Sequence, residues 1–504
     1  MGDNIFYRCN SLKTFTIPNG VTKIGYMAFY ECSMLQTVIL PNTVTSLATI
    51  SFADSGLRYI TIPGSVTTIG RSAFQDCYHL VNITLSNGLT TILDNAFDGC
   101  TSITSIKIPD SVTTIGMQAF IHCRNLQTVI MSKNIVTIEK DAFKWCNLNS
   151  IEIPKSAVSI GDYLFYENKN LKSAAIYASL SYISNALFGE CVNLVKVTIA
   201  GKPTSIGYSV FEGCENLESL VLDFSNVRSI GSNAFCICKK LKNIQIPNGI
   251  TVINKGSFAS CKMMKSIIIP NTVTSIGNSA FYKCDNAITI KIPNSVISIG
   301  DDAFGYCSRV INFTIPDSLI SIGRTAFANY FHDDTLILKL PSKLTKINNS
   351  ILFTCTLKRV IIPPSVVEIC DFAFDSLYCR GKIELPPSVV SIGEYAFWRC
   401  RSMNIIPNSV KSIGNNAFDF CYYLENLTFP NGLTSINNSL FHDCDNLKSV
   451  SFPDSVTSIG SRVFSGCEML QYVKLPRKQI SPFNQPIFKR QLYYPGKYQR
   501  LFSP

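Results

Sequence analysis

Hydrophobic and polar residues alternate in a pattern that returns about every 23 residues along almost the whole chain. In one unit, Leu80 to Thr101, Ile83 and Leu85 alternate with polar residues, which predicts a short half-buried strand. Most units continue with a proline, a turn-forming pair and a second alternating piece that ends at Ile-Gly, where the glycine tolerates a positive φ. The remaining x-x-Ala-Phe-x-x-Cys predicts one helical turn with Ala, Phe and Cys directed inward.

The repeated phenylalanine marks the successive units. It stands at Phe29, Phe52, Phe74, Phe97, Phe120, Phe143, Phe165, Phe188, Phe211, Phe235, Phe258, Phe281, Phe304, Phe327, Phe353, Phe374, Phe397, Phe418, Phe441 and Phe464. A fixed period of this length predicts a stacked solenoid, because one unit cannot bury its apolar side without a neighbour. Equivalent strands should then lie parallel, ~4.8 Å apart. The pattern therefore directs the search for function to an extended surface rather than to a catalytic pocket.

The pattern Leu-x-x-Ile-x-Ile-Pro-x-x-Val-x-x-Ile-Gly-x-x-Ala-Phe-x-x-Cys resembles the BspA-like leucine-rich repeat, also called the treponemal-type repeat, over roughly residues 1–476. We therefore expect an α/β-type repeat solenoid of about twenty 23-residue coils, with short strands and helical turns. The resemblance further implies a right-handed leucine-rich-repeat superhelix whose parallel β-sheet lies on the concave face. It also implies a surface antigen or adhesin of host-associated bacteria and parasitic protists, a family with no catalytic residues.

We expect a continuous solenoid over residues 1–476 and a separate basic, aromatic tail over 477–504. The chain starts inside a repeat, since Gly2 to Cys9 match only its second half, so the first coil is exposed or the chain is a fragment of a longer protein. The spacing is irregular at about 328–363, which fits either a degenerate repeat or a protruding contact loop. The tail fits a cap over the last coil, an unstructured end, a protein contact or a contact with membrane or nucleic acid.

Charge excludes one class of partner for the solenoid. The net charge is +11, but six of the basic residues lie in 477–504, so the solenoid is only mildly basic and nucleic acid is not an expected partner there. No apolar run is long enough to span a bilayer, and residues 1–12 do not read as a signal peptide. Location on the cell surface is implied by the resemblance alone, and a cytoplasmic location stays open.

Cysteine follows the repeat rather than a disulfide framework. Of 20 cysteines, 16 stand three residues after the repeated phenylalanine, counting Cys9 after Phe6 of the first half-repeat, and Ser55, Asn168 and Tyr330 take that slot elsewhere. A residue type confined to one slot of a repeat predicts buried thiols more than disulfides, since stacked side chains project in parallel. The remaining cysteines are out of phase and are the better candidates for reactivity: Cys236, Cys355, Cys370 and Cys379.

Motifs for catalysis are not found in this sequence. The four histidines occupy different phases of the repeat, so we expect no histidine cluster. Metal-ligand spacings, phosphate-binding glycine loops and nucleophile motifs are missing as well. We therefore expect no enzyme activity and no cofactor.

The position in the middle of the first strand is the candidate binding column. It lies between two inward apolar residues and should point outward, yet it varies between apolar, polar and charged types. Our candidate ligand-binding residues in this column are Lys107, Ile130, Glu152, Val221, Gln245, Ile268, Lys291, Lys339, Ile361 and Glu384. A neutral β-branched solvent face is the alternative interpretation.

Two kinds of function follow from these patterns. We expect a non-catalytic recognition protein that binds a protein or cell-surface macromolecule through the sheet. An intracellular scaffold for protein–protein interaction, or a fragment of a larger repeat protein, is the alternative.

Overall fold

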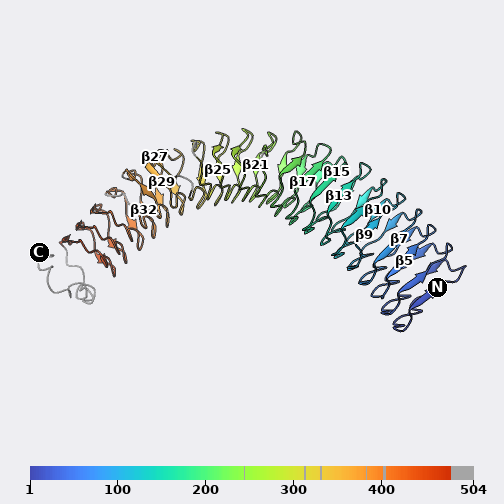
Figure 1. Ribbon diagram of the computed structural model, residues 1–504. Coiled ribbons are helices and arrows are strands. Elements are labelled where there is room, and N and C mark those ends of the chain that lie inside the picture. Colours follow the sequence, from blue (N-terminus) through green and yellow to red (C-terminus); the bar gives the residue numbers. More distant parts are fainter. Residues whose placement is uncertain (243, 311–313, 330–331, 382, 401–404, 478–504) are drawn as a thin grey trace. The chain divides into compact units, whose positions relative to one another are not determined.

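The structure is a computed structural model that describes residues 1–242, 244–310, 314–329, 332–381, 383–400 and 405–477. In these ranges the regular elements are short strands, and no helix occurs. The chain divides into two compact units, Met1–Ile250 with Ser257–Met263, and Thr251–Gly256 with Met264–Pro504. Within each unit, successive coils are stacked side by side (Figure 1).

Most coils open with a first strand, where apolar and polar residues alternate. These first strands are β1 (Thr14–Thr16), β3 (Thr37–Ile39), β5 (Tyr59–Ile62), β7 (Asn82–Leu85), β9 (Ser105–Lys107), β11 (Thr128–Ile130), β13 (Ser150–Ile153), β15 (Ser173–Ile176), β17 (Lys196–Ile199), β19 (Ser219–Val221), β22 (Ser266–Ile268), β24 (Thr289–Lys291), β27 (His332–Lys339), β29 (Thr356–Ile361), β31 (Tyr378–Cys379), β34 (Asn426–Thr428), β36 (Ser449–Ser451) and β38 (Tyr472–Lys474).

A second strand of two residues follows the proline turn. These are β2 (Lys23–Ile24), β4 (Ser46–Leu47), β6 (Thr68–Ile69), β8 (Thr91–Ile92), β10 (Thr114–Ile115), β12 (Thr137–Ile138), β14 (Ser159–Ile160), β16 (Tyr182–Ile183), β18 (Ser205–Ile206), β20 (Ser229–Ile230), β21 (Val252–Ile253), β23 (Ser275–Ile276), β25 (Ser298–Ile299), β26 (Ser321–Ile322), β28 (Lys346–Ile347), β30 (Glu368–Ile369), β32 (Ser391–Ile392), β33 (Ser412–Ile413), β35 (Ser435–Ile436) and β37 (Ser458–Ile459).

All strand pairs are parallel and join equivalent positions of neighbouring coils. Phe15 of β1 faces Val38 of β3, and the second strands β2 to β14 form one seven-stranded sheet. The proline turn between the two strands closes with a bond from the Val66 N–H to the Pro63 carbonyl, 3.0 Å long. The predicted solenoid of parallel strands is therefore confirmed.

The predicted helical turn is wrong. In the segment Met27–Cys32, Met27 and Glu31 have φ of 52° and 56°, in the left-handed region. The alternation turns every second N–H toward the next coil, so that Phe29 donates to the Ser51 carbonyl at 2.8 Å, while Cys32 bonds within its own coil to Phe29. A helix would use these N–H groups for its own hydrogen bonds and would leave the carbonyl groups of the neighbouring coil without donors. We call this element the turn segment.

The glycine of the Ile-Gly pair is required for a reason other than a positive φ. Gly70 does not have a positive φ. A Cβ built on it would stand 2.5 Å from the Leu47 carbonyl oxygen of the preceding coil. The slot is therefore restricted by the close approach of two coils, not by the conformation of one.

The repeated phenylalanines form the core. From Phe29 to Phe258 the rings of successive coils are nearly parallel, with centroids 5.1–6.1 Å apart. Each ring in this row is fully buried, with the Ala or equivalent residue before it packed beside it. Stacked aromatic pairs add to the burial of apolar area, so the row links each of these coils to its neighbours.

One repeat was placed wrongly from the sequence. The Phe327 N–H donates to the Ile351 carbonyl, so Leu352 takes the core slot and Phe353 follows it, half-buried. Cys355 then stands three residues after the core residue and is in phase after all. The coil before it carries the inserted residues, where the register of β27 against β29 shifts between Asp333 and Ile337. Tyr330 and the tail from 478 onward lie outside the described residues.

Replacing Phe120 by alanine should lower the free energy of unfolding by ~3–5 kcal/mol, because a fully buried ring is lost from the stack. Hydrogen exchange should show that protection falls mainly in the coils of Phe97, Phe120 and Phe143, since each repeat contacts only its neighbours. Ile130→Ala, at an exposed position, should change stability by less than ~0.5 kcal/mol. An equal loss of protection along the whole chain would contradict this account of the core.

Candidate functional site

The predicted binding column forms an exposed face. We call it the first-strand face: the outward side chains in the middle of the first strands. All ten candidate residues are exposed, and the apolar ones are strongly so, with Ile130 55% and Ile268 59% accessible. Their neighbours along each strand are buried, as Val129 is beside Ile130. The alternation of the pleat thus places these side chains on the surface.

The structure brings some candidates together and separates others. Ile130 lies directly beside Lys107, Ile268 beside Lys291, and Ile361 beside Lys339. Glu152 and Val221 stand at the two ends of the sheet β13-β15-β17-β19. The remaining two, Gln245 and Glu384, are exposed but lie outside the described strands. Five candidates belong to each unit, so they form two sets rather than one.

The first-strand face mixes apolar and charged groups at neighbouring positions. Three times an isoleucine stands beside a lysine, at the ~4.8 Å spacing of paired strands. Glu384 is engaged with Arg359, whose guanidinium is 2.7 Å from its carboxylate, but both side chains are well exposed and such a pair contributes little. The face therefore offers apolar contact area with flanking charge.

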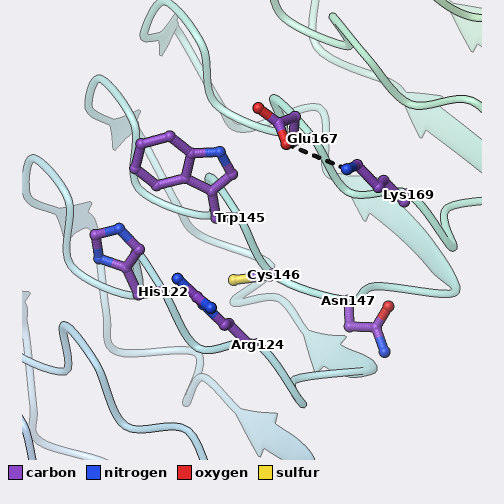
Figure 2. Close-up of a pocket in the computed structure, with 7 residues that line it drawn as sticks. All are labelled: His122, Arg124, Trp145, Cys146, Asn147, Glu167 and Lys169. Atoms are coloured by element: carbon purple, nitrogen blue, oxygen red, sulfur yellow. Dashed lines mark ion pairs between the residues drawn. The ribbon is translucent and has the colours of Figure 1, made fainter.

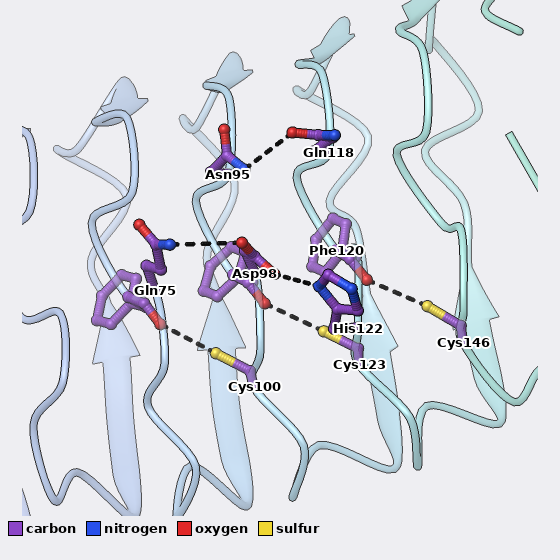
Figure 3. Close-up of polar contacts among 11 residues, drawn as sticks. Gln75, Asn95, Asp98, Cys100, Gln118, Phe120, His122, Cys123 and Cys146 are labelled. Atoms are coloured by element: carbon purple, nitrogen blue, oxygen red, sulfur yellow. Dashed lines mark hydrogen bonds and ion pairs between the residues drawn. The ribbon is translucent and has the colours of Figure 1, made fainter. Parts of the chain in front are cut away.

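The cysteines form a column of thiols inside each unit. The thiol of Cys100 donates to the Phe74 carbonyl of the preceding coil at 3.1 Å, and Cys123 and Cys146 repeat the contact (Figure 3). Asn168 takes the same slot and donates its amide to the Phe143 carbonyl. No disulfide occurs within the described residues, which include every cysteine. In these coils the slot thus holds a group that donates a hydrogen bond to the backbone of the preceding coil.

Our reactive-thiol candidates are not activated. Cys355 and Cys379 are buried, and Cys355 belongs to the thiol column through its bond to the Phe327 carbonyl. Cys236 and Cys370 are half-buried, and desolvation raises the pKa of each to about 11. A raised pKa leaves little thiolate near neutral pH, and the thiolate is the nucleophile.

The turn segments carry a second surface that the sequence analysis did not identify. Both tryptophans of the chain stand there, directly after the core phenylalanine or one residue later. The His122 ring stacks on Trp145, with ring centroids 4.8 Å apart. Its Nδ1 lies 2.9 Å from the Asp98 carboxylate (Figure 3). In the other unit, the Arg399 guanidinium lies over Trp398 at 4.5 Å. Aromatic, cationic and acidic groups therefore gather on this side of each unit.

An open hollow of about 380 Å³ lies beside Trp145, across three successive coils (Figure 2). The sequence carried a signal for it, namely the spacing of 22 rather than 23 residues between Phe143 and Phe165. The spacing alone does not predict a hollow, because its walls are formed by side chains of the neighbouring coils.

Within the described residues, no group of three or more His, Cys, Asp or Glu side chains is arranged to hold a metal ion. Over the same ranges, no helix has the length and apolar character that a bilayer crossing needs. The expectation that the chain has no cofactor stays a prediction.

Comparison with protein families gives an extensive match. The model of the BspA type leucine-rich repeat region, with six copies, matches residues 1–127, 90–218, 204–332, 330–406 and 402–492. No curated protein matches the chain.

Several solved structures are similar. A leucine-rich cell surface protein of Faecalibacterium prausnitzii is 28% identical, with a TM-score of 0.38, over 64% of this chain and 82% of that one. A leucine-rich repeat protein of Bacteroides ovatus is 22% identical, with a TM-score of 0.33, over 92% and 87%. The pneumococcal vaccine antigen PcpA is 19% identical, with a TM-score of 0.37, over 64% and 87%.

The thiol column predicts a loss of stability in alkali. Burial raises the pKa of the Cys77 thiol from 9.0 to about 12 in the folded chain. The folded state therefore holds this proton more tightly, so the stabilisation is complete below pH ~9 and is lost as the pH rises toward 12. Urea unfolding between pH 7 and 11 should show this decline, and Cys77→Ala should make the decline smaller. An identical pH dependence in the variant would contradict the expectation.

Proposed function

The chain belongs to the BspA-type leucine-rich repeat family, and from this premise we propose that it is a non-catalytic recognition protein of the surface-antigen or adhesin type. Its ligand is a protein or another cell-surface macromolecule. The first-strand face is the contact surface in this proposal, and each unit contributes its own set of candidate residues to it.

One observation carries the proposal. The first strands hold a row of exposed side chains whose chemical type varies from coil to coil, while the buried positions on either side keep one type. Val221, Ile268 and Ile405 are each more than half accessible on this row, beside polar and charged positions. Large apolar groups within a rim of charge are typical of surfaces that bind macromolecules.

An intracellular scaffold of the same shape is the second candidate. It is favoured by the thiol column, because disulfides are rare where the surroundings are reducing, and buried thiols without disulfides fit such a compartment. In this case the first-strand face binds a partner protein inside the cell.

The contact surface can be tested with a photo-reactive amino acid. We expect a benzophenone side chain in place of Ile130 or Ile268 to cross-link a macromolecule, because these side chains stand at the centre of the proposed contact surface. The same group in place of Val158 is the matched control, since Val158 is 75% accessible but precedes a second strand. Equal cross-linking from all three positions, or from Val158 alone, would exclude the first-strand face.

The two candidate functions differ in where the chain is accessible. For a surface antigen, a membrane-impermeant amine reagent applied to intact producing cells should label the exposed lysines, among them Lys107 and Lys291. Labelling that appears only after the cells are opened, with the full-length product present, would favour the intracellular scaffold.

A further inference from the structure

We propose that the hollow beside Trp145 is a binding site for an acidic saccharide, a sugar that carries a carboxylate among its hydroxyl groups. This site contains none of the ten residues of the first-strand face, so it stands or falls independently of the proposed function. Four steps support it: where the hollow lies, how its aromatic wall is held, which charges surround it and which ligand groups match them.

The hollow lies at a coil whose loop is shorter than the loops on either side. In the coil of Phe120, two residues separate Cys123 from the next core leucine, whereas in the coil of Phe143 only Asn147 separates Cys146 from Leu148. Both Cys146 and Leu148 remain buried, so the missing residue is taken from the exposed part of the loop. The flanking loops are longer and project beyond it, which leaves a recess between them.

The shortened loop is stabilised by the following coil. In a loop of full length, the N–H of the core leucine bonds to the carbonyl of the cysteine in its own coil, as Leu126 does to Cys123. The Leu148 N–H donates instead to the Asn168 side-chain carbonyl at 3.1 Å, while the Asn168 amide bonds the Phe143 carbonyl. The recess is thus a fully bonded local structure rather than a defect.

The aromatic wall is fixed from both faces of the indole ring. His122 stacks on Trp145, and the Lys144 ammonium lies 4.3 Å from the ring centroid. The same lysine contacts Asp141 at 3.3 Å, and the Asp98 carboxylate holds His122. Figure 2 shows the indole beside the imidazole, with the Arg124 side chain below them in that view.

Two cationic side chains lie on opposite sides of the hollow. Arg124 projects from the preceding loop and Lys169 from the following loop, two coils apart and therefore ~10 Å along the stack. Arg124 is exposed and has no ion-pair partner within the described part of the chain. Lys169 contacts Glu167 at 3.5 Å, but the lysine is 64% accessible, so this pair is weak and can reorient toward a ligand.

The mixture of donors and acceptors decides the ligand class. Arg124 and Lys169 favour an anionic group, for which a planar guanidinium is suited when the anion is a carboxylate. Asn147 and Glu167 add acceptor atoms to the same hollow. Hydroxyl groups both donate and accept, so those of a saccharide can donate to Glu167, whereas the side-chain carboxylates of an acidic peptide only accept. A volume of about 380 Å³ also lies within the ~300–1,000 Å³ range of small-ligand sites.

The test uses the whole chain and the fluorescence of Trp145. Trp398→Phe removes the other indole, since the chain has two tryptophans. The probes are sialyllactose, a glucuronic-acid disaccharide, neutral lactose and a short Asp/Glu peptide. We expect both acidic saccharides to change the Trp145 emission with dissociation constants on the order of 1 mM, and binding to weaken with salt.

Variants identify the site. Arg124→Ala and Lys169→Ala should each weaken saccharide binding at least tenfold. Lys239→Ala is the matched control, because Lys239 holds the same slot in a coil whose loop has full length and is paired with Glu215. Insertion of one asparagine after Asn147 restores the loop length and should abolish binding, with the unfolding temperature showing that the coil still folds.

The outcomes separate the alternatives. The proposal is overturned if neither acidic saccharide changes the Trp145 emission at a concentration 20 times the expected dissociation constant of about 1 mM. It is also overturned if lactose binds equally well. Tighter binding of the acidic peptide would assign the hollow to a protein partner instead and also overturns it. Binding that survives Arg124→Ala and the insertion would place the saccharide elsewhere. None of these results bears on the cross-linking expected at Ile130 and Ile268.

Discussion

Every coil depends on the next one for its hydrogen bonds as well as for its hydrophobic core. In the turn segment, alternate N–H groups point at the carbonyls of the neighbouring coil, and the phenylalanine between them stacks on the next ring. Neither interaction is available to a single coil, so stability arises at each contact between neighbours. The inward and coil-facing positions are consequently committed to structure, and function is left to side chains that point outward.

The outward positions offer two different kinds of surface. On the first-strand face, the pleat places one side chain per coil in a straight row, so that Ile130 and Lys107 or Ile268 and Lys291 are direct neighbours. Such a row is broad and shallow, which suits a large partner. The hollow beside Trp145 is small and has a fixed aromatic wall with charge on both flanks, which suits a small polar group. The two proposed contact surfaces therefore differ in the size of the ligand that each suits.

The sequence analysis succeeded where one coil repeats the chemistry of the last. The strands, the proline turns, the buried phenylalanines and the thiol column follow from side-chain types that recur at fixed positions. It failed for the turn segment because residues such as Met27 and Glu31 carry no sign of a left-handed φ, and only the bonds to the next coil require it. It also assigned Phe353 to the core slot that Leu352 occupies. The core residue of the other units is a phenylalanine, so the phenylalanine was chosen over the leucine before it.

Of the two candidate sites, one could be predicted from the sequence and the other could not. The ten residues of the first-strand face could be identified because alternation alone decides which side of a strand is outward. The hollow could not, since it depends on a loop that is short only by comparison with the loops stacked on either side, and on Asn168 of the following coil. The sequence by itself thus determined which side chains point inward and which outward, because that is a property of each repeat. Only the tertiary structure decided the backbone of the turn segment, the need for Gly70 and the shape of the recess, because each is set by atoms of an adjacent coil.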